Sequence, residues 1–143
     1  MLSEADHNYE RVPGNWYERG FGALYPIVYA HRTIEAARPE AEFAARQLAL
    51  SDRDSVLDLC CGSGRHMVHL ARITPRVVGL DYSPELLTIA TESLRGMAGL
   101  VRGDMRSIPF GCVFDIVASF FTSFGYFEAV DDNMRVVEEI ARV

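Results

Sequence analysis

A glycine turn between an apolar stretch and a helical pattern constrains this chain most. Val56–Leu59 has the composition of a short buried strand, and Gly62-Ser63-Gly64 follows it closely. Behind the turn, Met67, Leu70 and Ala71 repeat at the spacing of one helical face. Glycines there let a backbone approach a ligand, and a helix N-terminus offers unpaired N–H groups. The segment therefore predicts a strand, a ligand-binding turn and a helix.

The alternation of strands and helices continues beyond this turn. Further strands are predicted at residues 76–80, 100–102 and 113–120, and the last of them is apolar almost throughout. Such a strand is typical of a sheet that is covered on both faces. Ser83 and Pro84 have the N-cap and first-turn preferences that begin a helix. The fold class is predicted to be α/β, an open parallel sheet with helices on both faces.

Two more helices are predicted at residues 39–50 and 131–141. Residues 1–37 are rich in aromatic side chains without a clean period, which favours an irregular or short-helical cap. We therefore divide the chain into a cap at residues 1–50 and a sheet domain at residues 51–143. The apolar faces of the two helices are expected to consist of Phe43, Ala44 and Leu48 in the first, and Met134, Val137 and Ile140 in the second.

Length and composition limit the class of protein. The chain has 143 residues, 49% of them hydrophobic, which predicts one domain with a real core. No apolar run approaches the ~20 residues that cross a bilayer, and the polar start has no signal-peptide pattern. Three cysteines are too few for a disulfide framework, and a net charge of −6 argues against nucleic-acid binding. We expect a cytoplasmic protein without a nucleic-acid or membrane partner.

Aspartates lie at or just after the carboxyl ends of three predicted strands. Asp58 lies in the first strand, while Asp81 and Asp104 follow the second and third. In open parallel sheets, ligands bind outside these ends. Asp81 is placed to accept both hydroxyls of a ribose, and Asp104 to accept from an adenine amino group. Singly, each is also explained as a helix cap or loop residue, but together with the glycine turn they favour a nucleotide site.

A dinucleotide-binding turn is the first alternative, and its spacing fails. Such a turn requires Gly-x-Gly-x-x-Gly. The corresponding positions are Cys60, Gly62 and Arg65, so only the middle glycine is present.

These residues resemble the class I S-adenosylmethionine-dependent methyltransferases. The similarity extends from Pro39 to the end of the chain, and its first motif is Leu-Asp-Leu-Cys-Cys-Gly-Ser-Gly-Arg-His at residues 57–66. Cys-Cys-Gly-x-Gly-Arg-His is similar to the motif of a bacterial subgroup that acts on small molecules. The stretches at residues 25–32 and 121–127 also look like that subgroup. The resemblance implies a Rossmann-like fold and the cofactor S-adenosylmethionine, with S-adenosylhomocysteine as product.

The resemblance also implies roles at the glycine turn. Asp58 would hold the methionine ammonium of the cofactor, and Gly62 and Gly64 would pass close to its methionine moiety. Cys60, which replaces the commoner first glycine, is a trait of the subgroup.

At the next two strand ends, Asp81 would bind the ribose hydroxyls and Tyr82 would flank the adenine. Asp104 would accept from the adenine amino group beside the Met105 backbone. We expect Asp81→Ala to weaken cofactor binding with little unfolding, because a strand-end carboxylate contributes little to the core.

Other candidates close the pocket. Ser119, with Phe120, would face the sulfonium at the end of the fourth strand. Tyr29 and Arg32, with Tyr17 and His31, are candidates for closing the pocket or pairing the cofactor carboxylate; packing of the cap is the competing explanation.

The implied reaction is direct displacement at the sulfonium methyl by a small-molecule acceptor, so no catalytic triad and no metal are expected. The cofactor carries the chemistry and the protein supplies positioning. His31 and His66 are the candidate general bases. His66 and His69 lie on one helix face, which we interpret as a solvated face rather than a metal site.

The chain departs from the family at its end. In the family, the last helix continues into further strands, so we expect those C-terminal strands to be missing here. The strand at residues 113–120 then becomes a sheet edge, a site of association for a second copy or a completing chain. We favour a truncated chain over a fragment that another chain or a swapped dimer completes, and over a short paralogue. The alternative functions are a non-catalytic module that binds S-adenosylmethionine or S-adenosylhomocysteine and acts through a partner, and another nucleotide-binding α/β protein.

Overall fold

The computed structural model describes residues 14–143, which build a four-stranded parallel sheet. Its spatial order is β3-β2-β1-β4, and all neighbouring strands run parallel. The predicted open α/β sheet is therefore confirmed. The strands are β1 (Val56–Leu59), β2 (Val77–Asp81), β3 (Gly99–Arg102) and β4 (Ile116–Ala118).

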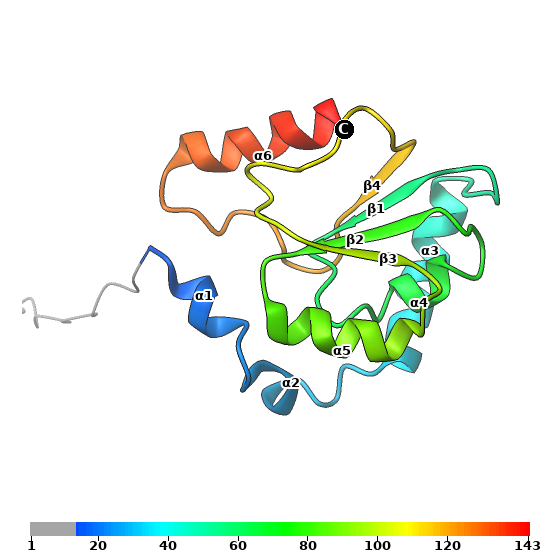
Figure 1. Ribbon diagram of the computed structural model, residues 1–143, viewed down its shortest axis with the longest axis horizontal. Coiled ribbons are helices and arrows are strands. Elements are labelled where there is room, and N and C mark those ends of the chain that lie inside the picture. Colours follow the sequence, from blue (N-terminus) through cyan, green and yellow to red (C-terminus); the bar gives the residue numbers. More distant parts are fainter. Residues whose placement is uncertain (1–13) are drawn as a thin grey trace, which may run out of the picture.

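Helices cover the sheet on both faces, as Figure 1 shows. Side chains alternate along β1: Val56 packs in a core with residues of α3, α4 and α5, and Leu57 packs with Val136 of α6 on the opposite face. Val56 and Leu57 are both buried, so each face of the sheet has its own core. The helices are α1 (Trp16–Gly20), α2 (Tyr25–Val28), α3 (Ile34–Gln47), α4 (Met67–Leu70), α5 (Pro84–Leu94) and α6 (Val130–Arg142).

Side-chain caps begin the two longer helices on one face of the sheet. Ser83 Oγ accepts from the Leu86 N–H at 3.2 Å, as the sequence predicted, and Pro84 occupies the first turn of α5. Thr33 Oγ1 accepts from the Ala36 N–H at 3.1 Å, so α3 begins five residues earlier than the predicted residue 39.

The predicted apolar face of α3 is wrong. Phe43 and Leu48 are exposed, and the buried residues are Ala37, Ala41 and Ala45. Small side chains at this spacing let α3 pack closely against α4, which larger residues would prevent.

The strand β4 is a sheet edge, as the sequence predicted, whereas the apolar stripe of α6 is less covered than the sequence predicted. The strand spans only residues 116–118, is half-buried, and within residues 14–143 it pairs with no strand other than β1. In α6, Val136 is the buried residue, whereas Met134 is 52% and Val137 is 43% exposed. The predicted stripe of α6 therefore faces outward in large part, because no further element of the described chain packs on it.

The N-terminal segment forms the predicted short-helical cap. Helices α1 and α2 are short and contain no buried residue, but α3 packs into the core of the sheet. The boundary at residue 50 stays a prediction, and residues 1–13, with Tyr9, lie outside the described residues. Within residues 14–143, none of the helices has the length and apolar character needed to cross a membrane.

Candidate functional site

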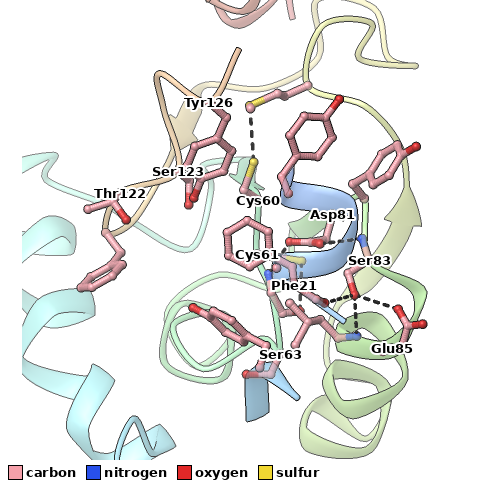
Figure 2. A pocket seen from close by; sticks show the side chains of 18 of the residues that line it. Phe21, Cys60, Cys61, Ser63, Asp81, Ser83, Glu85, Thr122, Ser123 and Tyr126 are labelled. Carbon is pink, nitrogen blue, oxygen red and sulfur yellow. Dashed lines mark hydrogen bonds between the residues drawn. The ribbon is translucent and has the colours of Figure 1, made fainter. Parts of the chain in front are cut away.

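A cavity of about 660 Å³ opens at the carboxyl ends of β1, β2 and β3, with the cap helices along its other side. Figure 2 shows side chains from the glycine turn, from the end of β2 and from residues 122–126 converging on it. The lining includes eleven predicted site residues: Tyr17, Tyr29, Asp58, Cys60, Gly62, His66, Asp81, Tyr82, Asp104, Met105 and Phe120.

Four predicted residues do not line this cavity, and one of them is the exposed His31. Gly64 lies beneath α5, where an added Cβ would be 3.2 Å from the Ala90 Cβ, so this glycine permits close helix packing. Ser119 is exposed and lines a shallow groove beside α3. The Arg32 guanidinium lies 3.5 Å from the centroid of the Phe121 ring. The structure thus brings the strand-end residues together but leaves these four outside.

Asp81 is a buried carboxylate that organises the turn between strands. Its Oδ2 accepts from the Gly62 N–H at 2.7 Å, and its Oδ1 accepts from the Ser83 N–H at 2.9 Å (Figure 2). Burial raises the pKa of Asp81, although these backbone hydrogen bonds oppose the rise. A carboxylate offers about four acceptor positions, so each oxygen keeps capacity for a ligand hydroxyl.

Asp58 is more deeply buried, at 1% exposure, and is incompletely paired. No group within residues 14–143 hydrogen-bonds to its Oδ2. Burial raises the pKa of Asp58 to about 8, the nearby Asp81 adds to the rise, and Arg65 opposes it. A buried acceptor without a donor is costly, and a cationic N–H group would satisfy it.

Cys60 adopts a backbone conformation that favours glycine. Its φ is +60°, and its Sγ lies 3.6 Å from the Met105 Sδ (Figure 2). Burial raises the pKa of the Cys60 thiol to about 12, with contributions from the nearby carboxylates. The thiol is therefore protonated and packs against Met105 rather than acting as a nucleophile.

Asp104 is held by a residue that sequence reasoning missed. Arg106 donates to it through Nε, at 3.1 Å to each oxygen, through Nη2 at 2.7 Å and through its backbone N–H at 2.8 Å. Partial burial raises the pKa of Asp104, but the Arg106 hydrogen bonds and charge outweigh it, so the pKa is lowered overall. The sequence signal was Arg106 itself, an arginine two residues after the acid that follows β3. This spacing alone does not distinguish a partner of Asp104 from an ordinary surface arginine.

Aromatic residues of the cap form the other wall of the cavity. Trp16 packs edge-on against Tyr126, with ring centroids 5.2 Å apart, and Phe21 lies 5.6 Å from the same ring. The Ser83 Oγ donates to the Phe21 carbonyl at 2.8 Å, so the cap is tied to the start of α5. Arg65 and Tyr126 line the cavity but were noticed only as parts of motifs.

The two histidines behind the glycine turn are buried, so the predicted solvated face is wrong. His66 Nε2 lies 2.6 Å from Glu40 Oε2, and its ring stacks on Phe120 at 4.1 Å. His69 Nε2 lies 2.7 Å from the Ile34 carbonyl oxygen. Burial lowers the pKa of His66, although Glu40 opposes this. The part of the chain that the structure describes holds no cluster of three or more metal-ligating side chains.

Comparison of the chain with known protein families gives a match over the sheet. The model of a methyltransferase domain matches residues 56–143, which include all four strands and the aspartates at their ends. The chain belongs to this methyltransferase family. The predicted family resemblance is confirmed.

Methyltransferases of amino sugars are among the relatives. The chain is 31% identical to dTDP-3-amino-3,4,6-trideoxy-alpha-D-glucopyranose N,N-dimethyltransferase of Streptomyces venezuelae, over 87% of this chain and 53% of that one. It is 34% identical to dTDP-3-amino-3,6-dideoxy-alpha-D-glucopyranose N,N-dimethyltransferase of Streptomyces fradiae, over 87% and 49%. The methyltransferase chain thus spans about half the length of these curated relatives.

Solved structures confirm the Rossmann-like methyltransferase fold. S-adenosylmethionine-bound CalS10, an amino pentose methyltransferase from Micromonospora echinaspora, has a TM-score of 0.71 and 30% identity, over 82% of this chain and 50% of that one. DesVI of Streptomyces venezuelae has a TM-score of 0.69 and 32% identity, with the same two coverages.

Proposed function

We propose that this methyltransferase domain binds S-adenosylmethionine and transfers its methyl group to a small-molecule acceptor. The observation that carries the proposal is the buried Asp58 carboxyl, whose Oδ2 has no donor among residues 14–143. The α-ammonium of the cofactor would supply that donor and a compensating positive charge. The family membership supports the same cofactor.

The neighbouring residues fit the rest of this ligand. Asp81 would accept the ribose hydroxyls with the acceptor positions left beside Gly62 and Ser83. Tyr82, which is 42% exposed, would flank the adenine, and Asp104 would accept from its amino group beside Met105. A cavity of about 660 Å³ is within the range of small-molecule sites.

Outside the cavity, the roles of Gly64, His31, Arg32 and Ser119 stay predictions. Tyr29 lines the cavity, and its ring centroid lies 4.5 Å from that of Tyr25, which supports a role in closing it.

The proposed reaction is an in-line displacement. When bound, the cofactor supplies an activated methyl group on a sulfonium. The chain's own residues bind and orient the ligand through the carboxylates, while the aromatic cap around Trp16 and Tyr126 excludes water. Because the departing thioether needs no proton, no general acid is required at the cavity.

The acceptor class we propose is an amine of a nucleotide-linked sugar. This proposal is supported by the names of the two Streptomyces relatives, both N,N-dimethyltransferases of dTDP-amino sugars. His66 is the candidate to take the amine proton. Its ring lines the cavity, and burial lowers its pKa, which favours the neutral ring that can accept a proton.

For the whole protein, we propose that a second copy or a completing chain covers the outer edge of β4. Exposed apolar residues gather around this edge and on α6, among them Val113, Phe121 and Met134. A cytoplasmic location is proposed as well, because all three cysteines are free thiols. The alternative function, a non-catalytic cofactor-binding module, is favoured only if binding occurs without turnover once this edge is covered.

The proposed identity of the cofactor is tested by calorimetric titration of the chain with S-adenosylhomocysteine. NAD is the matched nucleotide control. We expect binding of the first and none of the second. The variant Asp58→Asn should weaken binding at least about tenfold, because an amide neither neutralises nor fully accepts from the ammonium. The exposed Asp52→Asn removes one charge elsewhere and should change nothing. Equal affinity of wild type and Asp58→Asn would contradict the proposal.

A further inference from the structure

Glu40 on α3 contacts the His66 ring from outside the cavity. The Glu40 Oε2 lies 2.6 Å from the His66 Nε2, and the two residues are 26 positions apart in the chain. The Glu40 side chain is 55% exposed and lines the shallow groove beside α3, whereas His66 is buried and lines the cavity. The ring therefore lies between an exposed carboxylate and the proposed reaction site.

The Glu40 carboxylate determines which ring nitrogen of His66 carries the proton. An ionised carboxylate only accepts hydrogen bonds, so Nε2 must donate. Burial lowers the pKa of His66, so the ring is neutral at pH 7 and has one N–H group. The side chain makes no cap bond to α4, and Glu40 is the one hydrogen-bond partner of the ring among residues 14–143. The pairing thus leaves Nδ1 with a free lone pair that can accept a proton.

His69, three residues further along the chain, has a different partner. Its Nε2 lies 2.7 Å from the Ile34 carbonyl oxygen, so an uncharged acceptor connects this ring to α3. His66 is paired with a carboxylate instead, and the Phe120 ring stacks on it with centroids 4.1 Å apart. A carboxylate stabilises an imidazolium more strongly than a carbonyl does. The His66 ring is therefore the one that is suited to gain a proton.

We propose that Glu40 is a positioning residue that orients the His66 imidazole, so that Nδ1 takes the proton of the acceptor amine. The inference rests on the proposed function, because it requires an amine at the cavity. As the methyl group moves to the amine nitrogen, the electron pair of the broken carbon–sulfur bond stays on sulfur, and an N–H proton passes to Nδ1. The imidazolium is stabilised by Glu40 and returns one proton to water after the product leaves.

The other charged groups that face His66 oppose its protonation. Arg65 and His69 both lower the pKa of the ring, and burial lowers it most. Glu40 raises this pKa through its hydrogen bond and its charge. Removal of the Glu40 charge should therefore make the ring a weaker base.

The test compares sinefungin with S-adenosylhomocysteine by calorimetry on the 143-residue chain. Sinefungin carries an amino group where the sulfonium methyl group of the cofactor would lie, and S-adenosylhomocysteine has no group there. At pH 7.5 we expect wild type to bind sinefungin at least about fivefold more tightly, because its amino group donates to Nδ1. This preference should decrease as the pH falls through the titration of the His66 ring, which NMR follows directly.

Three variants make the result specific. Glu40→Gln keeps the size of the side chain without its charge. It should reduce the preference for sinefungin about threefold or more, and lower the midpoint of the His66 titration by about half a pH unit or more. Glu40→Asp restores the charge and should recover part of both effects. Glu42→Gln removes an exposed carboxylate from the same helix and should leave both at the wild-type values.

The affinity for S-adenosylhomocysteine separates positioning from a purely structural role. Because Glu40 does not line the cavity, this affinity should be unchanged in all three variants. A weakened affinity in Glu40→Gln would mean that the residue shapes the cavity as a whole, which overturns the inference.

The remaining outcomes distinguish the two proposals. If wild type binds S-adenosylhomocysteine but Glu40→Gln keeps either the preference for sinefungin or the His66 midpoint, the inference is overturned and the proposed function stands. Equal wild-type affinity for the two compounds has the same meaning. If wild type binds neither compound, the proposed function fails and the inference fails with it.

Discussion

The Asp81 carboxylate at the end of β2 accepts a 2.7 Å hydrogen bond from the backbone N–H of Gly62, the residue that turns the chain after β1. A second bond, from the Ser83 N–H, connects the same carboxylate to the cap of α5. One side chain therefore joins two strand ends and a helix start. This arrangement changes the expectation that Asp81 contributes little to stability.

Asp81→Ala is expected to lower both affinity and stability. The substitution leaves two backbone N–H groups without their acceptor in a site where Asp81 is 8% exposed, which costs about 1–3 kcal/mol for each such group. Asp81→Asn retains one acceptor oxygen and should lose less stability. Urea unfolding of both variants and titration with S-adenosylhomocysteine measure the two effects, and an Asp81→Ala protein as stable as wild type would disprove the structural role.

Asp58 should make cofactor binding depend on pH. Burial raises its pKa to about 8, so below that pH an ammonium ligand must displace a proton from the carboxyl. Affinity for S-adenosylhomocysteine should rise between pH 6 and pH 8, approaching about tenfold per pH unit at the lower end. Calorimetry in buffers of different ionisation enthalpy detects the released proton. In Asp58→Asn both the proton release and the pH dependence should vanish.

The same carboxyl has an opposite effect on the unliganded protein. Its pKa is raised from 3.8 to about 8 on folding, so the unfolded chain binds fewer protons between these values. Stability attributable to Asp58 is complete below pH 4 and is lost as the pH rises towards 8. Asp58→Asn should therefore melt at a higher temperature than wild type at pH 8, while their difference shrinks at pH 5. If the wild type instead gains stability relative to Asp58→Asn as the pH rises from 5 to 8, the assignment is contradicted.

Cys60 should be a site where glycine stabilises the chain relative to alanine. Its φ of +60° lies in the left-handed region, which costs residues with a Cβ about 1–2 kcal/mol. Cys60→Ala and Cys60→Gly both remove the contact with Met105 Sδ, but only the glycine also removes the backbone strain. Chemical denaturation should find the glycine variant more stable by about 1 kcal/mol. Equal stability of the two would show that the strain is not present.

Gly79→Ala is expected to disturb the floor of the site. An added Cβ would lie 2.5 Å from Met67 Sδ and 2.7 Å from Cys61 Sγ, and Met67 is fully buried. Overpacking of this kind costs about 1–3 kcal/mol. The matched control is Gly111→Ala, where nothing lies within 4 Å of the added atom. Thermal melts of the pair separate the steric effect from the general effect of replacing glycine.

Patterns that are local in the chain were the ones that could be predicted. The strand at Val56–Leu59, the Ser83 cap and the aspartates after successive strands all depend on neighbours within a few residues. In a parallel sheet, consecutive strands place their carboxyl ends along one edge. The family, the α/β fold and the gathering of Asp58, Asp81 and Asp104 at one cavity therefore followed from the sequence.

Contacts between distant segments were decided only by the tertiary structure. Gly64 lies beneath Ala90 rather than in the cavity, and His66 and His69 are buried against α3 and the residues beside it. Arg106 reaches Asp132 across 26 residues of chain. Periodicity gives the direction of a side chain about its own helix or strand, but not which element packs on that side. The burial that shifts the pKa of Asp58, and the clamp that holds Asp104, arise from that packing.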